Sequence, residues 1–153
     1  MVNILFVCSG DTCRSPIISA IFNDEIQKMQ KETLVKASSA GIFVNSNDLS
    51  ISDDAKYALS EFNILHSNHT PTALSPKLIK QNQLVICVNS AIKNAILNKE
   101  PNAKNVVAFS DYIKGAEIAD PFGLGRSAYL ELCKMAKVYV TKLINILNKE
   151  GII

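Results

Sequence analysis

A cysteine and an arginine near the amino terminus have the types and the spacing needed to attack and hold a phosphoryl group. Cys8 and Arg14 are separated by five residues, among them Gly10, and a serine-proline pair follows directly. A cysteine thiolate is a strong nucleophile. The planar guanidinium of arginine binds two phosphate oxygens at once. The segment Cys8–Ser15 is therefore a candidate phosphate-binding loop with a nucleophile at its first position.

The elements that would position this loop are a strand before it and a helix after it. Four short, unbroken apolar runs are typical of strands buried on both faces: Val2–Val7, Leu34–Ala37, Leu84–Val88 and Val106–Phe109. Helical patterns lie between and after them: Pro16–Lys31, Asp53–Phe62 after an N-cap at Ser52, a helix opening at Ser75-Pro76, Ser90–Lys99 and Ser127–Lys149. This alternation predicts an α/β fold of three layers, α/β/α, with a central parallel sheet of about four strands. Ligands bind such sheets outside the carboxyl ends of the strands, so the loop after the first strand is the expected site.

The predicted loop has several sources of positive potential. Its backbone N–H groups can turn inward as an anion-binding nest, and the following helix adds unpaired N–H groups and a partial positive charge. These surroundings predict a Cys8 thiol whose pKa lies below its ordinary value of about 8.5, with the thiolate as the resting form. Ser15 is expected to cap the helix or to donate a hydrogen bond to the sulfur. The residues predicted to bind phosphate are Ser9, Gly10, Asp11, Thr12, Cys13, Arg14 and Ser15.

Asp120 is the candidate general acid. Pro121 follows it and disfavours a helical conformation there, and residues 122–125 contain two glycines, as a lid loop would. Because a departing group benefits from a positioned acid, we expect Asp120 to protonate the leaving group and then to activate water against a phosphocysteine. This mechanism needs no metal and no other cofactor.

The segment Cys8–Pro16, followed by a helix, resembles the signature of the low-molecular-weight protein tyrosine phosphatases. Ser39-Ala40-Gly41 is similar to the Ser-Ala-Gly element of that family, and Asp120-Pro121 is similar to its general-acid loop. The resemblance covers essentially the whole chain. It implies one phosphatase domain over residues 1–153 that acts on a phosphorylated protein and releases inorganic phosphate.

Within the family, the bacterial protein-arginine phosphatases provide the best match to the motifs. Thr12 resembles their threonine, where tyrosine-specific members usually carry a bulkier aliphatic residue. Residues 120–123 resemble their Asp-Pro-Phe-Gly, and residues 111–115 resemble the lead-in to that loop. The resemblance therefore implies that the substrate is phosphoarginine in proteins.

Three residues are expected to set the specificity: Thr12, Phe43 and Phe122. Phosphotyrosine needs a deep slot with aromatic walls, for which Phe43 and Phe122 are the candidates. Phosphoarginine carries a guanidinium, which the Thr12 hydroxyl and the Asp120 carboxylate can hold.

Three other functions stay open from the sequence. A tyrosine phosphatase of the same family differs only in the leaving group. A thiol-dependent arsenate reductase is disfavoured because Cys87 and Cys133 do not form the close pair that would relay a disulfide. A phosphate-binding module without activity is disfavoured because binding alone needs neither a nucleophile nor an acid.

Asp11 departs from the family, which usually has asparagine at this place in the loop. Both residue types tolerate a left-handed backbone conformation. A carboxylate facing a phosphate dianion would repel it, so we expect Asp11 to point away, toward supporting groups such as Ser39 or His69. The segment Asn68-His69-Thr70 resembles the one that carries the supporting histidine of the family.

Cys13 shares the loop with Cys8, and two roles are open for it. It is either a packed small residue or the partner of Cys8 in a reversible disulfide that protects the nucleophile from over-oxidation.

The composition is that of an ordinary globular protein, and it narrows the function classes. A net charge of +2 is too small to predict a nucleic-acid or membrane partner. We find no apolar run long enough to span a membrane and no signal peptide, so a cytoplasmic location is expected. Four cysteines without zinc-site spacing and only two histidines predict neither a disulfide framework nor a metal site.

Overall fold

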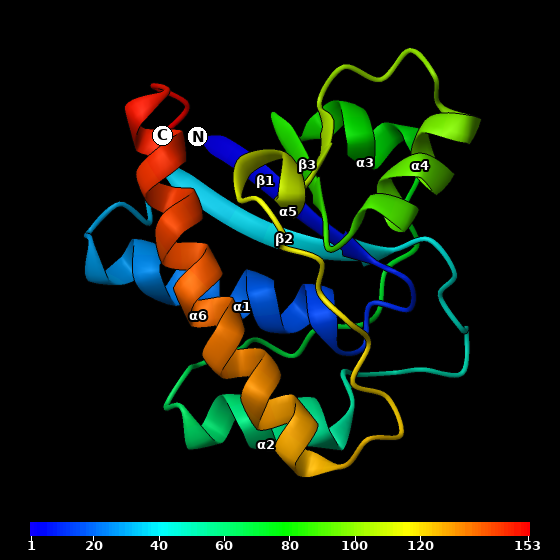
Figure 1. The fold of residues 1–153 in the computed structure, drawn as a ribbon, viewed down its shortest axis with the longest axis vertical. Helices are drawn as coiled ribbons and strands as arrows, with labels where there is room; N and C mark the ends of the chain where they lie inside the picture. Colours follow the sequence, from blue (N-terminus) through cyan, green and yellow to red (C-terminus); the bar gives the residue numbers. More distant parts are fainter.

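The computed structural model describes residues 1–153 and contains one sheet of four parallel strands, in the order β2-β1-β3-β4 (Figure 1). The strands are β1 (Val2–Cys8), β2 (Val35–Gly41), β3 (Leu84–Cys87) and β4 (Val106–Ala108). β2 pairs with one edge of β1, and β3, the next strand along the chain, pairs with its other edge. The strand order therefore reverses beside the carboxyl end of β1, where ligands of such sheets bind.

Helices cover both faces of the sheet and confirm the predicted α/β/α layers. They are α1 (Arg14–Lys28), α2 (Asp53–Glu61), α3 (Pro76–Gln81), α4 (Ser90–Lys99), α5 (Phe109–Tyr112) and α6 (Arg126–Lys149). One face is covered by α1 and α6, while α3 and α4 lie on the other, and α2 packs on α6 away from the sheet (Figure 1). None of these helices combines the length and the apolar character that a membrane crossing requires.

The starts of three helices are fixed by side chains that accept backbone hydrogen bonds. Ser52 accepts from the N–H of Ala55 at the start of α2, and Ser75 accepts from the N–H of Leu78 at the start of α3. Both caps were predicted, and each contributes about 1 kcal/mol to its helix. Asn89 caps α4 in the same way.

The core lies along the central strand. The Phe6 ring is fully buried and contacts Phe22 of α1, at 5.5 Å between centroids, and Phe109 at the start of α5, at 5.7 Å. Both contacts are made by one ring and so lie on one face of the sheet, while the neighbouring residues Leu5 and Val7 point to the other face and are also buried. The predicted apolar stripe of α6 is buried throughout: Tyr129, Leu132, Ala136, Val140, Leu143 and Leu147.

Some element boundaries differ from the sequence-based expectation. Residues 39–41 belong to β2 rather than following it, since β2 pairs with β1 as far as Cys8 opposite Gly41. Phe109 opens the short helix α5 rather than ending a strand, and α5 itself was missed. Helix α1 starts at Arg14, with Pro16 in its first turn, where proline is tolerated.

Candidate active site

The loop between β1 and α1 brings hydrogen-bond donors to the Cys8 sulfur. The backbone N–H of Asp11 donates to Sγ at 3.3 Å, and Ser15 Oγ lies 2.9 Å from the same sulfur. Asp11 has a φ of 56°, which is the left-handed conformation expected for this position. The loop thus turns around the sulfur and leads directly into the first turn of α1.

Arg14 is buried at the start of α1, and its guanidinium is held by two distant segments. Nη2 donates to Ser9 Oγ at 2.9 Å within the loop, and Nη1 donates to the Ile118 carbonyl at 3.1 Å. Nη2 also lies 3.8 Å from Asp120 Oδ2. In Figure 1 the yellow segment that leads to α6 passes beside the loop after β1, as these contacts require.

One small pocket joins the three candidate catalytic residues, Cys8, Arg14 and Asp120. Its remaining lining residues come from the loop and from the segment before α6: Ser9, Gly10, Thr12, Cys13 and Phe122. The Asp120 side chain is about half exposed, so it borders solvent at the mouth of the pocket. Two of the predicted phosphate-binding residues, Asp11 and Ser15, are fully buried and do not line it.

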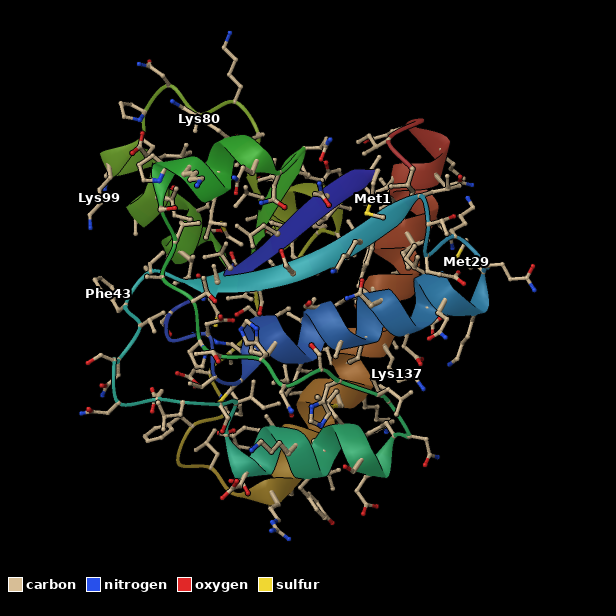
Figure 2. The ribbon with its side chains drawn as sticks, turned by 180° about the vertical axis from the view of Figure 1, so that it is seen from behind. Met1, Met29, Phe43, Lys80, Lys99 and Lys137 are labelled. Atoms are coloured by element: carbon tan, nitrogen blue, oxygen red, sulfur yellow. The ribbon has the colours of Figure 1, made fainter.

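The two candidate aromatic walls are separated. Phe122 lines the pocket with Cys8, whereas Phe43 lines a neighbouring apolar groove together with Leu74 and Ile96. Figure 2 shows Phe43 on the loop after β2, projecting from the edge of the molecule. The pocket therefore has one aromatic wall and not two.

The expected low thiol pKa is not what this site provides. Burial raises the pKa of the Cys8 thiol, and it outweighs the lowering by the Ser15 hydroxyl, by the backbone N–H groups of Ser15 and Asp11, and by the Arg14 charge. The expectation was wrong because it counted the donors and the positive charge but not the loss of water around the sulfur.

Asp11 points away from the pocket, as expected, into a network of hydrogen bonds. Its Oδ2 lies 2.6 Å from His69 Nε2 and accepts from the N–H of Thr72 at 2.9 Å, while Oδ1 accepts from Ser15 Oγ at 2.8 Å. Ser39 Oγ lies 3.1 Å from the same His69 nitrogen. Residues 69–72 and the end of β2 therefore support the loop from behind.

Four features of the site were missed from the sequence. The Ser9 hydroxyl and the Ile118 carbonyl bind Arg14, and the Thr72 N–H binds Asp11. Backbone groups carry no residue-type signal, so the contacts of Ile118 and Thr72 could not be read from the sequence. The fourth is the close packing at Gly41, where a Cβ would lie 2.5 Å from the Ser9 carbonyl oxygen.

The other cysteines are free thiols. Cys13 Sγ lies 3.3 Å from Tyr129 Oη and 3.5 Å from Ser52 Oγ, so it packs toward α6 and α2. The reversible disulfide with Cys8 stays a prediction. Burial raises the pKa of both Cys87 and Cys133 to about 12, which is unfavourable for the thiolate relay of an arsenate reductase. No three His, Cys, Asp or Glu side chains are grouped so that they could hold a metal ion.

Comparison with known proteins decides the family. The model of the low molecular weight phosphotyrosine protein phosphatases matches residues 3–152. The chain belongs to this family. It is accordingly a cysteine-dependent protein phosphatase, with an α/β fold and a cysteine loop after its first strand.

Curated relatives of the phosphatase fall into two groups by substrate. The protein-arginine-phosphatase of Bacillus subtilis is 28% identical over 97% of this chain and 96% of its own length. The protein-arginine-phosphatase of Geobacillus stearothermophilus is 32% identical over 78% of each chain. The low molecular weight protein-tyrosine-phosphatase YfkJ of Bacillus subtilis is 25% identical over 98% of each chain.

Solved structures give the same picture. The phosphatase superimposes on the YwlE arginine phosphatase, in a mutant with a phosphorylated active-site serine, with a TM-score of 0.87 at 28% identity over 97% of both chains. It matches the low molecular weight protein tyrosine phosphatase of T. tengcongensis equally well, with a TM-score of 0.87 at 27% identity over 96% of this chain. Fold and overall identity therefore do not separate the two substrates.

Proposed function

We propose that this phosphatase removes phosphate from phosphoarginine in proteins, with Cys8 as nucleophile, Arg14 as phosphate clamp and Asp120 as general acid. The composition of the pocket carries the proposal. Thr12 and Asp120 offer a hydroxyl and a carboxylate to a guanidinium, and Phe122 is the one aromatic side chain that lines the pocket. A phosphotyrosine ring would need a second wall, and Phe43 lines a different groove.

The first step transfers the phosphoryl group to sulfur. The attacking form of Cys8 is the thiolate, so the thiol loses its proton before attack. The thiolate attacks phosphorus in line, the P–N bond breaks, and the departing guanidine nitrogen takes a proton from Asp120. Arg14 and the loop N–H groups hold the equatorial oxygens, whose charge is spread in a loose transition state.

The second step releases phosphate. Asp120, now ionised, accepts a proton from a water molecule that attacks the phosphocysteine. The S–P bond breaks, inorganic phosphate leaves, and Cys8 returns as the thiolate. Four free thiols fit a reducing compartment, so we place this reaction in the cytoplasm.

A direct substrate comparison tests the proposal. Two peptides of one sequence, carrying either phosphoarginine or phosphotyrosine, are mixed with excess enzyme, and the phosphocysteine is trapped by acid quench in a single turnover. We expect the intermediate on Cys8 to form faster with phosphoarginine. Faster formation with phosphotyrosine would make the chain a tyrosine phosphatase instead.

The Cys8→Ser variant is the control for the nucleophile. We expect it to lose turnover with both peptides while it still binds inorganic phosphate, because Arg14 and the loop N–H groups are unchanged. Full activity in this variant would rule out the covalent mechanism for both substrates.

A further inference from the structure

An apolar groove lies beside the phosphate loop, between the loop after β2 and the helices α3 and α4. Most of its lining residues are hydrophobic, and Lys99 and Glu100 are the only charged ones. Ile79 and Ile96 in this lining are buried, whereas the Phe43 side chain at the edge is 71% exposed. The groove is therefore an open surface that favours an apolar side chain of a partner.

The groove is joined to the active-site pocket by backbone hydrogen bonds. The Ile42 N–H donates to the Cys8 carbonyl oxygen at 3.1 Å, and the Phe43 N–H donates to the Ser9 carbonyl oxygen at 2.8 Å. Chains that are hydrogen-bonded side by side lie about 5 Å apart, and an extended polypeptide advances about 3.3 Å per residue. When the phosphorylated residue of a polypeptide enters the pocket, a side chain roughly two to four positions away therefore reaches the groove.

The two helices beside the groove are positively charged. They contain no acidic residue and four lysines, Lys77, Lys80, Lys93 and Lys99. Lys93 binds Asp111, and the other three form no ion pair. Figure 2 shows Lys80 and Lys99 projecting into solvent from the part of the molecule that borders Phe43. This charge favours a partner that carries acidic residues next to its apolar side chain.

We propose that the groove is a docking site for the substrate protein. It binds an apolar side chain of the segment that carries the phosphorylated residue, and acidic residues of that segment lie near the lysines of α3 and α4. The inference rests on the proposed active site at Cys8, but it does not depend on whether the phosphorylated residue is arginine or tyrosine. Recognition of the substrate then extends from the phosphoryl group to the neighbouring sequence.

The test is a set of peptides that carry phosphoarginine or phosphotyrosine in a background of serine and glycine. A single leucine is placed two, three or four residues before or after the phosphorylated residue. We expect the best position to raise kcat/KM by about tenfold over the peptide without leucine, the size of burying much of one apolar side chain. No increase at any position overturns the proposal.

Ala95→Phe fills the groove from a partly buried position of α4. We expect the leucine effect to disappear in this variant, and hydrolysis of a small aryl phosphate, which does not extend to the groove, shows that the variant is folded. Ala20→Phe is the matched control at a partly buried alanine of α1, on the opposite face of the sheet, and should keep the leucine effect. An undiminished leucine effect in Ala95→Phe would reject the docking site.

Lys99→Glu keeps the proposal testable if Ala95→Phe does not fold. With the best leucine peptide, the parent should prefer two aspartates beside the leucine over two lysines. This preference should fall by about two- to fivefold in Lys99→Glu, as for the loss of an exposed ion pair. Lys142→Glu makes the same charge change at an exposed position of α6 and should keep the preference. Equal preferences in the two variants would contradict the proposal.

The outcomes separate the groove from the proposed substrate. A leucine effect confined to the phosphotyrosine peptides rejects phosphoarginine as the substrate and supports the groove. Faster hydrolysis of the phosphoarginine peptides without any leucine effect rejects the groove alone. If a second copy of the chain covers the groove instead, the parent sediments as a dimer, Ala95→Phe sediments as a monomer and leucine has no effect on hydrolysis, which also rejects the groove as a substrate site.

Discussion

Single residues in this site are held in place before any substrate arrives. Arg14 donates hydrogen bonds to Ser9 in the loop and to Ile118, 104 residues away in the chain. A guanidinium fixed in this way does not have to be reorganised when a phosphoryl group binds, which is the condition for strong electrostatic stabilisation of a transition state. Because its partners lie far apart in the sequence, Arg14 is held in this way only when the whole chain is folded.

The acid role of Asp120 predicts a dependence on the leaving group. Asp120→Asn should slow the hydrolysis of a phosphoarginine peptide by roughly 10²–10⁴-fold, the usual contribution of a general acid. It should slow an aryl phosphate with an acidic phenol far less in the phosphorylation step, because that phenolate leaves without a proton. Single-turnover rates with both substrates check this. Equal losses would show that Asp120 acts by binding and not by proton transfer.

The sequence predicted most of the residues around the pocket, because their spacing and types carry the signal. Cys8, Arg14 and Asp120 come together at one pocket, and Asp11 turns back toward His69. What the sequence could not provide was the effect of burial on the thiol, which depends on how the finished fold excludes water. Phe43 and Phe122 are both exposed aromatic residues near the site. The sequence did not indicate that they line different pockets.

Among the elements, β2 has a direct effect on the phosphate loop. Its last residue, Gly41, pairs with Cys8, and its Cα approaches the backbone of Ser9 and Asp11 so closely that a Cβ would lie 2.5 Å and 2.9 Å from their atoms. Contacts this short with backbone cannot be relieved by a side-chain rotation. The end of β2 therefore sets how near the loop can lie to the sheet.

Gly41→Ala should disrupt the loop. We expect a loss of about 1–3 kcal/mol in the free energy of unfolding, as in other overpacked sites, and a larger relative loss in turnover because the loop must shift. Ser38→Ala, at an exposed position of the same strand, is the control and should behave like the parent. Denaturant unfolding and kcat for both variants check this, and an active Gly41→Ala enzyme would contradict it.

The limits of sequence reading at this scale have physical causes. The apolar runs predicted all four strands, but Ser38 to Gly41 carry small and polar side chains with little strand preference. They form strand because β1 lies beside them. Helix α5 has four residues, too few to show a helical period, and its first residue, Phe109, extends an apolar run.

For the molecule as a whole, the buried thiols make the free energy of unfolding decrease at alkaline pH. Burial raises the pKa of Cys87 to about 12, above the ordinary value of 9.0 that the unfolded chain has. Below pH 9 both states are protonated and the stability is complete. Between pH 9 and 12 only the unfolded chain releases the proton, so the free energy of unfolding falls by about 1.4 kcal/mol per pH unit for this thiol.

Cys87→Ala should therefore reduce the alkaline slope of stability by about 1.4 kcal/mol per pH unit between pH 9 and 11. Val85→Ala on the same strand is the control, because it removes buried volume without a titrating group and should lower stability equally at each pH. Urea unfolding from pH 7 to 11 provides the measurement. Parallel curves for the parent and Cys87→Ala would contradict the prediction.

The sulfur belongs to Cys8, the last residue of the central strand, and this position limits where substitutions can change the substrate. β1 has a strand on each side and is buried from Ile4 to Cys8, so Cys8 cannot be moved without rebuilding the sheet. Residues 120–125 are exposed except for Pro121. They include Asp120 and two glycines with positive φ, and they touch the site only at Arg14 and the pocket mouth. Substitutions that change the substrate can therefore accumulate in this short segment while the chemistry of the reaction is conserved.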